Sequence, residues 1–196
     1  CIRDRNKVNV IKILPGGVVT AKDTAEIELD ANGEFVRNPE VDLVKVAVVE
    51  RHQGTGNVAC GFLKGYGIKE GAVALSVAHD SHNIIVVGVN DEEMEFAVNS
   101  LIEQEGGIVL VKEGKVIESM PMPIAGLMSD QSGEWVDQKL TDIHEKAYEE
   151  LGICGDVEPV MTLCFMSLAV IPEIKLTDMG LFDVTTFSFI PVEVEE

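Results

Sequence analysis

Residues 71–89 decide the fold of this chain, and their sequence is GAVALSVAHDSHNIIVVGV. Two apolar runs rich in valine, alanine and isoleucine, 71–78 and 84–89, lie on either side of a polar break at 79–83. Apolar runs of this length are typical of buried β-strands. The stretch therefore predicts two strands that are joined by an unusually polar loop.

A helix is predicted directly after this stretch. Asn90 is a suitable N-cap, Glu93 completes a capping box, and the acidic residues at 91–93 favour the positive end of the helix dipole. The apolar positions that share one face of this helix are Met94, Val98, Leu101 and Ile102.

Further elements are predicted on both sides of these residues. The other β-type runs are 8–14, 18–29, 41–49, 108–111, 116–117 and 182–194. Helical patterns cover Ser132 to Gly152 and 159–169, and the second of these is apolar on every side, as in a buried helix. Because strands and helices do not alternate regularly, we expect an α+β fold with a mixed, largely antiparallel sheet packed with about three helices. Neither a repeat nor a linker is evident, so residues 1–196 are predicted to form one domain.

The charge balance limits the choice of partners. The chain has 15 Lys and Arg against 34 Asp and Glu, a net charge of −19. A surface this negative repels phosphate backbones and anionic lipids, so neither nucleic acid nor a membrane is an expected partner. The four cysteines lie far apart and are expected to be reduced thiols of a cytoplasmic protein. The first residues are polar, unlike a signal peptide, and a start at Cys1 suggests a processed or truncated piece.

The polar break is the chemically richest part of the sequence. Two of the four histidines, His79 and His82, lie there with Asp80 between them, followed by Asn83. Such a pair could ligate a metal, or one ring could act as a general base that Asp80 orients. The alternative is a polar turn whose side chains bond their own backbone.

A second candidate region is Glu50-Arg51-His52, which ends a buried-looking strand and leads into a glycine-rich loop. It is about as consistent with a surface ion pair and a solvated histidine as with a site. The glycines match neither the dinucleotide nor the mononucleotide loop pattern. His144 is assigned to a solvated helix face, Phe165 and Phe187 to the core, and Cys164 to a segment too apolar to favour a thiolate.

Taken together, these segments resemble the C-terminal domain of bacterial and archaeal adenine deaminases. The resemblance is carried by residues 76–84, 50–52 with the following glycine loop, 61–67, 123–129 and 170–177, which occur in the order of the family. It covers most of the chain from about residue 44, and it is more specific than any single short motif.

The resemblance implies hydrolysis of adenine to hypoxanthine and ammonia by a metal-activated water. Enzymes of this family are similar to amidohydrolases, which hold iron or manganese in a TIM-type barrel. This chain has no His-x-His pair, and a barrel of typically ~250 residues does not fit its length. We therefore expect only the C-terminal domain, with the metal-binding barrel of the same enzyme and adenine as its partners, and a homo-oligomer as the assembly.

The resemblance leaves three hypotheses for the polar residues. In the first they complete the pocket of the barrel, in the second the domain is a structural or oligomerisation module, and in the third it is a metallohydrolase built on His52, His79, His82 and Asp80. The residues expected to support catalysis are His79, Asp80 and His82, those expected to bind substrate are Glu50, Arg51, His52, Ser81 and Asn83, and none is assigned as a metal ligand.

Overall fold

The computed structural model describes residues 7–194 and has the predicted α+β fold. Its strands are β1 (Lys7–Ile13), β2 (Thr20–Glu26), β3 (Glu28–Leu29), β4 (Phe35–Val36), β5 (Leu43–Val49), β6 (Val58–Lys64), β7 (Ala72–Leu75), β8 (Ile84–Gly88), β9 (Gly107–Lys112), β10 (Lys115–Pro121), β11 (Ile174–Thr177), β12 (Gly180–Asp183) and β13 (Ser188–Phe189). Its helices are α1 (Asp91–Glu103), α2 (Gly133–Glu149) and α3 (Pro159–Cys164).

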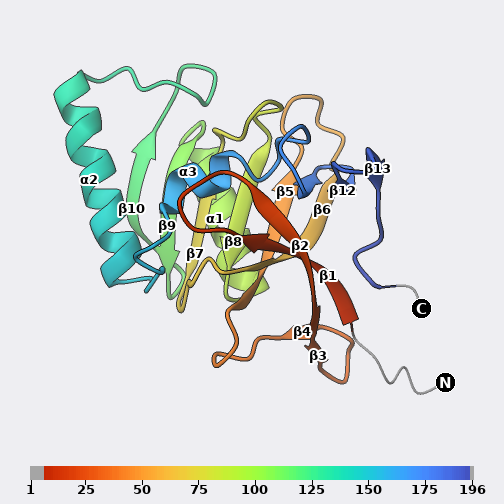
Figure 1. Ribbon diagram of the computed structural model, residues 1–196. Coiled ribbons are helices and arrows are strands. Elements are labelled where there is room, and N and C mark those ends of the chain that lie inside the picture. Colours follow the sequence, from red (N-terminus) through yellow and green to blue (C-terminus); the bar gives the residue numbers. More distant parts are fainter. Residues whose placement is uncertain (1–6, 195–196) are drawn as a thin grey trace.

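One eight-stranded sheet organises the molecule (Figure 1). Its strand order is β10-β9-β7-β8-β5-β6-β1-β2, and every neighbouring pair is antiparallel except β1 with β6. The strands β11 to β13 form a small three-stranded sheet, and β3 pairs with β4. The prediction of a mixed, largely antiparallel sheet is confirmed.

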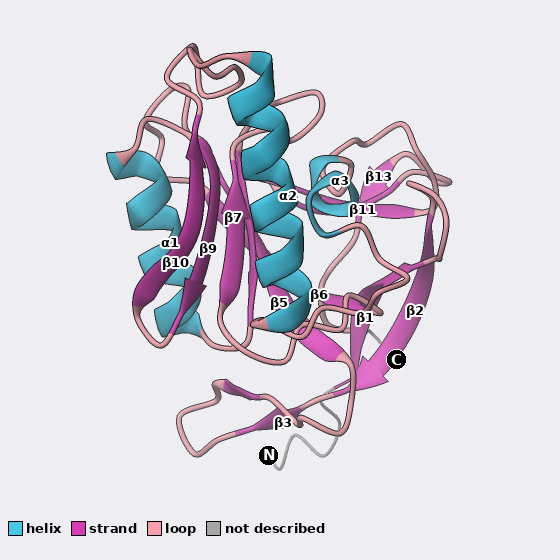
Figure 2. Cartoon of the chain, turned by 90° about the vertical axis from the view of Figure 1, so that its left-hand side faces the viewer, coloured by secondary structure: helices cyan, strands magenta, loops and turns pink. Residues whose placement is uncertain are grey.

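The two strands of the fold-deciding stretch lie in the middle of the main sheet. Every residue of β7 and β8 is buried, because helices cover both faces here. On one face α2, α3 and the small sheet pack over the larger core, and α2 lies across this face in Figure 2. On the other face α1 packs against β7, β8 and β9. A Cβ on Gly88 would lie 2.6 Å from Met94 Cγ, so only glycine allows α1 to approach this closely.

Asn90 is the N-cap of α1 as predicted, but the predicted capping box does not form, because the Glu93 carboxylate accepts from the Gly114 amide at 3.0 Å. Asn90 caps α1 by accepting a hydrogen bond from the Glu93 amide at 2.8 Å, and Ser132 caps α2 through the Trp135 amide at 3.3 Å. Within residues 7–194 no helix is both long and apolar enough to cross a membrane.

Two expectations about the C-terminal third are wrong. The segment 159–169 is helical only as far as Cys164, and Met161 on that helix is 51% exposed. Phe187, which the sequence assigns to the core, is 75% exposed, and its ring meets the Phe182 ring edge-on at 5.3 Å between centroids. The apolar residues of this region therefore cover the small sheet only in part.

The small sheet is bound to the turn between β1 and β2. Thr20, at the start of β2, exchanges two backbone hydrogen bonds with the residues directly before β11. Its carbonyl accepts from the Glu173 amide at 2.7 Å, and its amide donates to the Pro172 carbonyl at 3.1 Å. Lys175 on β11 is fully buried, and its Nζ donates to the Val18 carbonyl at 3.0 Å. This lysine is thus a structural donor inside the domain.

Candidate functional site at the strand ends

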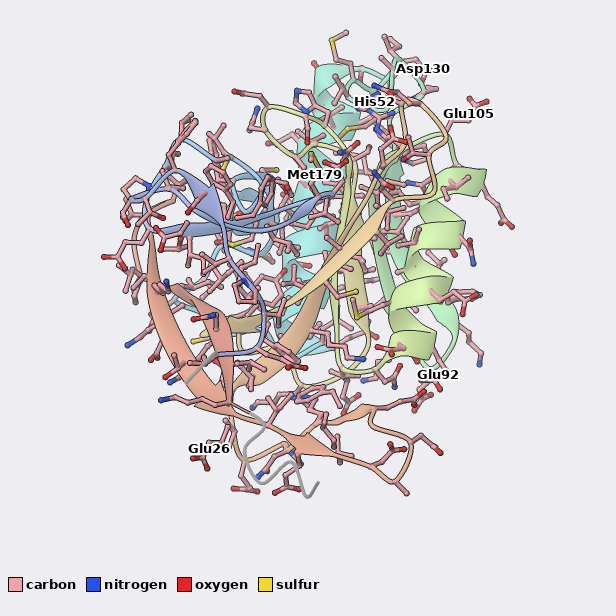
Figure 3. The ribbon with its side chains drawn as sticks, turned by 90° about the vertical axis from the view of Figure 1, so that its right-hand side faces the viewer. Glu26, His52, Glu92, Glu105, Asp130 and Met179 are labelled. Atoms are coloured by element: carbon pink, nitrogen blue, oxygen red, sulfur yellow. The ribbon has the colours of Figure 1, made fainter. Side chains whose placement is uncertain are left out.

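The predicted site residues lie together at one end of the main sheet. Strand β5 ends beside the start of β8, because Val49 pairs with Ile84, and this brings 50–52 next to 81–83. Figure 3 shows His52 and Asp130 at this end of the molecule, whereas Glu26 and Glu92 lie at the other. We call the following residues the strand-end cluster: Glu50, Arg51, His52, His79, Asp80, Ser81, His82 and Asn83.

Arg51 connects three segments of the chain. Its Nε donates to the His82 carbonyl at 2.5 Å, its Nη2 donates to the Ala125 carbonyl at 2.9 Å, and its backbone amide donates to Asn83 Oδ1 at 3.3 Å. The guanidinium makes no ion pair with a carboxylate of residues 7–194. Partial burial lowers the pKa of Arg51, and within residues 7–194 the guanidinium donates to two backbone carbonyls.

The loop after β10 packs against Arg51 through a glycine. Gly126 has a φ of +72°, and a Cβ there would lie 2.9 Å from Arg51 Nη1. Ser76, fully buried at the end of β7, donates to the Gly126 carbonyl at 2.5 Å and accepts from the Gly107 amide at 2.8 Å. A single hydroxyl therefore joins the loop 122–130 to the ends of β7 and β9.

Glu50 organises the glycine-rich loop that follows it. Its carboxylate accepts from the backbone amides of His52, Gln53 and Thr55 at 2.5, 2.7 and 3.0 Å, and from the Thr55 hydroxyl at 3.0 Å. These donors stabilise the ionised form and lower the pKa of Glu50 to about 2. Ring atom Nε2 of His52 lies 2.7 Å from the Ser81 carbonyl, so Nε2 carries the proton in this contact.

The two histidines of the polar break contact each other and α3. The His79 ring is 5.3 Å from the His82 ring and 4.9 Å from the Phe165 ring, measured between centroids. The His79 amide donates to the Cys164 carbonyl at 2.8 Å, which fixes this loop on the end of α3. Phe165, assigned to the core from the sequence, is half-buried and forms one side of the histidine pair.

His82 carries the feature that most resembles a binding position. Its backbone is left-handed, with a φ of +52°, and its ring atom Nδ1 is buried without a hydrogen-bond partner among the described residues. Burial, followed by the positive charges of His79 and Arg51, lowers the pKa of His82. The ring is therefore mainly neutral at pH 7 and keeps a buried polar atom without a partner in residues 7–194, which in a native protein needs an explanation.

Asp80 and Ser81 are exposed at the tip of the loop, and neither side chain bonds to a histidine ring. His144, assigned to a solvated helix face, instead pairs through Nε2 with Glu158 and joins α2 to the start of α3. Burial raises the pKa of the Cys164 thiol to about 12. Sequence reasoning did not single out Ser76 or the 122–130 loop as site residues, although both fall within or beside the family-like segments.

The cluster does not form a metal centre of its own. In the part of the chain that the structure describes, no group of three or more His, Cys, Asp and Glu side chains is placed to hold one ion. Of its carboxylates, that of Glu50 is occupied by its own loop, and that of Asp80 is exposed and has no hydrogen bond to either histidine ring. Residues 7–194 therefore do not fit a catalytic metal.

The fold and the cluster define this chain as an α+β domain that carries a polar site at its strand ends and, over residues 7–194, no assembled metal site. The family model of the adenine deaminase C-terminal domain matches residues 17–188. The chain belongs to this family.

Curated relatives agree with this assignment. "Adenine deaminase 2" of Desulfotalea psychrophila is 70% identical over 95% of this chain and 32% of its own length. The adenine deaminases of Ligilactobacillus salivarius and Bacillus subtilis are 48% and 45% identical, over 97% and 98% of this chain and 33% of their own lengths in both cases. The chain thus spans about a third of the relatives that it matches.

Proposed function

We propose that this chain is the C-terminal part of an adenine deaminase, which hydrolyses adenine to hypoxanthine and ammonia. The names of the relatives and an identity of 70% to one of them support this assignment. The chemistry at C6 of the purine would belong to the rest of the enzyme, where the resemblance to amidohydrolases implies an iron or manganese centre.

Within that enzyme, we propose that the strand-end cluster completes the substrate pocket. The observation that supports this role is the buried, unpaired Nδ1 of His82 beside the Arg51 cation, which has no carboxylate partner in residues 7–194. In the neutral tautomer with its proton on Nε2, the free Nδ1 of His82 accepts a hydrogen bond, and adenine offers N–H donors at its amino group and its five-membered ring. His82 would orient the base, His79 and Phe165 would support the ring of His82, and Arg51 would fix the loops around it.

No step is assigned to a metal held by this domain, because its residues do not fit one. Asp80 and Ser81 lie at the exposed tip of the same loop, where they face whatever covers the cluster. In our proposal they contact substrate or exclude water once the remaining part of the enzyme is in place. His52 and Asn83 keep the loop in position through the Ser81 carbonyl and the Arg51 amide.

The test uses a full-length chimera in which this chain replaces the matching third of the Desulfotalea psychrophila protein. We expect His82→Asn to lower kcat/KM for adenine by about 100-fold, because an amide tolerates the left-handed backbone but lacks the imidazole ring that packs against His79 and holds the acceptor in place. Asp80→Asn should lower it by a smaller factor. His144→Asn, which changes a histidine outside the cluster, is the control and should stay within about twofold. Unchanged turnover in both cluster variants would remove the proposed role.

A second candidate function is that of an assembly module. The observation that favours it is a group of exposed apolar side chains on the small sheet, where Met179, Phe187 and Phe189 are 72%, 75% and 50% exposed. If this reading is right, His82→Asn leaves turnover unchanged, whereas Phe187→Ser and Met179→Ser shift the sedimentation coefficient of the chimera to that of a smaller species.

A further inference from the structure

The face of the main sheet that α1 covers is only partly closed. Helix α1 packs over β7, β8 and β9, and the β3–β4 hairpin covers the far side, where the Phe35 and Phe62 rings meet at 5.0 Å. Between these two covers a groove of about 330 Å³ opens over β5 and β6. Its apolar lining includes Ala47, Val49, Val58, Cys60, Met94 and Val98.

The groove exposes apolar side chains that would be buried if this face of the sheet were fully covered. Val58 is 55% exposed, and Cys60 is also accessible although the surrounding side chains partly bury its thiol and raise its pKa. Main-sheet neighbours on the opposite face, such as Val46 and Val48, are completely buried. One face of the sheet at β5 and β6 is therefore fully covered, whereas the other face is only partly covered.

The wall of the groove is acidic. Helix α1 carries five Asp and Glu residues and no Lys or Arg. Lys45 on the sheet binds both carboxylate oxygens of Asp91, at 2.8 and 2.7 Å, and is thereby neutralised. Glu95, one turn further along the same wall, makes no ion pair with any residue of 7–194. Binding of a polypeptide segment in this groove would be stabilised if the segment placed a positive charge beside Glu95.

The groove also leads directly to the strand-end cluster. Val49 and Val58 pair with each other, and the loop between them contains Glu50, Arg51 and His52. The Glu50 amide donates to the Asn57 carbonyl at 3.0 Å and closes the base of this loop. Any segment that fills the groove therefore ends beside the residues of the proposed site.

We infer that the groove is the docking surface for the remainder of the enzyme. The occupant is an apolar segment that carries a Lys or Arg against Glu95, and about two thirds of the length of the matched relatives lies outside this chain and is available to provide it. The inference rests on the proposed function only for the identity of the partner. The surface itself follows from the uncovered strands and the acidic wall.

The natural cysteines allow a direct test. Cys60 lies in the groove, whereas Cys154 is exposed outside it and serves as the internal control. Alkylation by N-ethylmaleimide is followed residue by residue by peptide mass spectrometry, in this chain alone and in the chimera with the Desulfotalea psychrophila protein. We expect the rate at Cys60 to fall at least about tenfold in the chimera, and the rate at Cys154 to stay within about twofold.

A charge reversal tests the chemistry of the occupant. In the chimera Glu95→Lys should restore at least about fivefold of the Cys60 rate, whereas Glu103→Lys, on the same helix but outside the groove, should not. Equal Cys60 rates in the chain and the chimera overturn the inference. So does a Cys60 rate that falls with the concentration of the isolated chain, which would assign the groove to a second copy.

Failure of this inference and failure of the proposed function give different results. Protection of Cys60 does not depend on turnover, and the effect of His82→Asn on turnover does not depend on labelling. A protected Cys60 in a chimera whose His82→Asn variant keeps full activity supports the docking surface and removes the catalytic role of the cluster. An accessible Cys60 together with the 100-fold loss of turnover gives the reverse conclusion.

Discussion

Lys175 and His82 are both basic residues with a buried side-chain nitrogen, but only the nitrogen of Lys175 has a hydrogen-bond partner in residues 7–194. Lys175 on β11 is fully buried, and its Nζ has a carbonyl partner that binds the small sheet to the β1–β2 turn. His82 keeps one ring nitrogen buried without a partner. The Lys175 Nζ therefore serves the architecture of the domain, whereas the His82 Nδ1 has no structural partner among the described residues.

The largest effect should come from removing the buried lysine. Burial lowers the pKa of Lys175 to about 8. At pH 7 the ammonium group is still charged, and its burial among apolar side chains lowers the free energy of unfolding. Lys175→Met removes this cost and loses one hydrogen bond, and we expect the free energy of unfolding at pH 7 to rise by about 2 to 3 kcal/mol.

The pH dependence supplies the control for this prediction. Between pH 8 and the ordinary lysine pKa of 10.5 the unfolded chain binds a proton that the folded chain has lost, so wild-type stability rises with pH across this window. Lys175→Met should lack that rise. Denaturant unfolding at pH 7 and pH 10 measures both effects. A variant less stable than wild type at pH 7 would make Lys175 a net stabilising residue and contradict the expected gain.

An intermediate effect is expected where Arg51 meets the neighbouring loop. Gly126→Ala places a Cβ against the guanidinium and adds backbone strain at a positive φ, and the expected loss is about 2 kcal/mol. Gly114→Ala is the matched control, because its φ is +66° and its Cβ would meet nothing within 4 Å. It should cost about 1 kcal/mol. Equal losses would show that Arg51 shifts freely and does not hold the loops.

The smallest effect should come from the available histidine itself. His82→Asn removes no hydrogen bond of the ring Nδ1 and retains a residue that tolerates a left-handed backbone. We therefore expect the free energy of unfolding to stay within about 0.5 kcal/mol of wild type. A loss of 2 kcal/mol or more in chemical denaturation would show that the His82 ring stabilises the fold and would contradict this prediction.

The sequence was a good guide to local structure. Several strands follow valine and isoleucine runs, Asn90 caps α1 as predicted, and α2 begins next to Ser132. Strand β6 was missed, because it lies in the glycine-dense stretch whose composition favours turns. The strand order could not be predicted from the sequence, because the parallel pairing of β1 with β6 depends on packing between distant segments. Phe187 was misplaced for a similar reason, since hydrophobicity alone does not say whether a partner surface exists in the same domain.

The candidate site was predictable in its residue types but not in its assembly. Its two histidine-bearing segments were evident from composition, and register places them together. The contact of Arg51 with Ala125 spans 74 residues of sequence, and that of Ser76 with Gly126 spans 50. No local pattern specifies such distances, and a buried serine is indistinguishable in sequence from an exposed one.

The two bonds of the Ser76 hydroxyl also have a consequence for motion. Because both bonds are buried, the loop 122–130 and the ends of β7 and β9 must move as one body or break them together. The opposite side of the cluster has no such restraint, since Gly54 and Gly56 are exposed and a side chain at either would meet nothing within 4 Å. The loop that Glu50 organises is therefore freer to move than the loop 122–130, which the buried Ser76 hydroxyl holds in place.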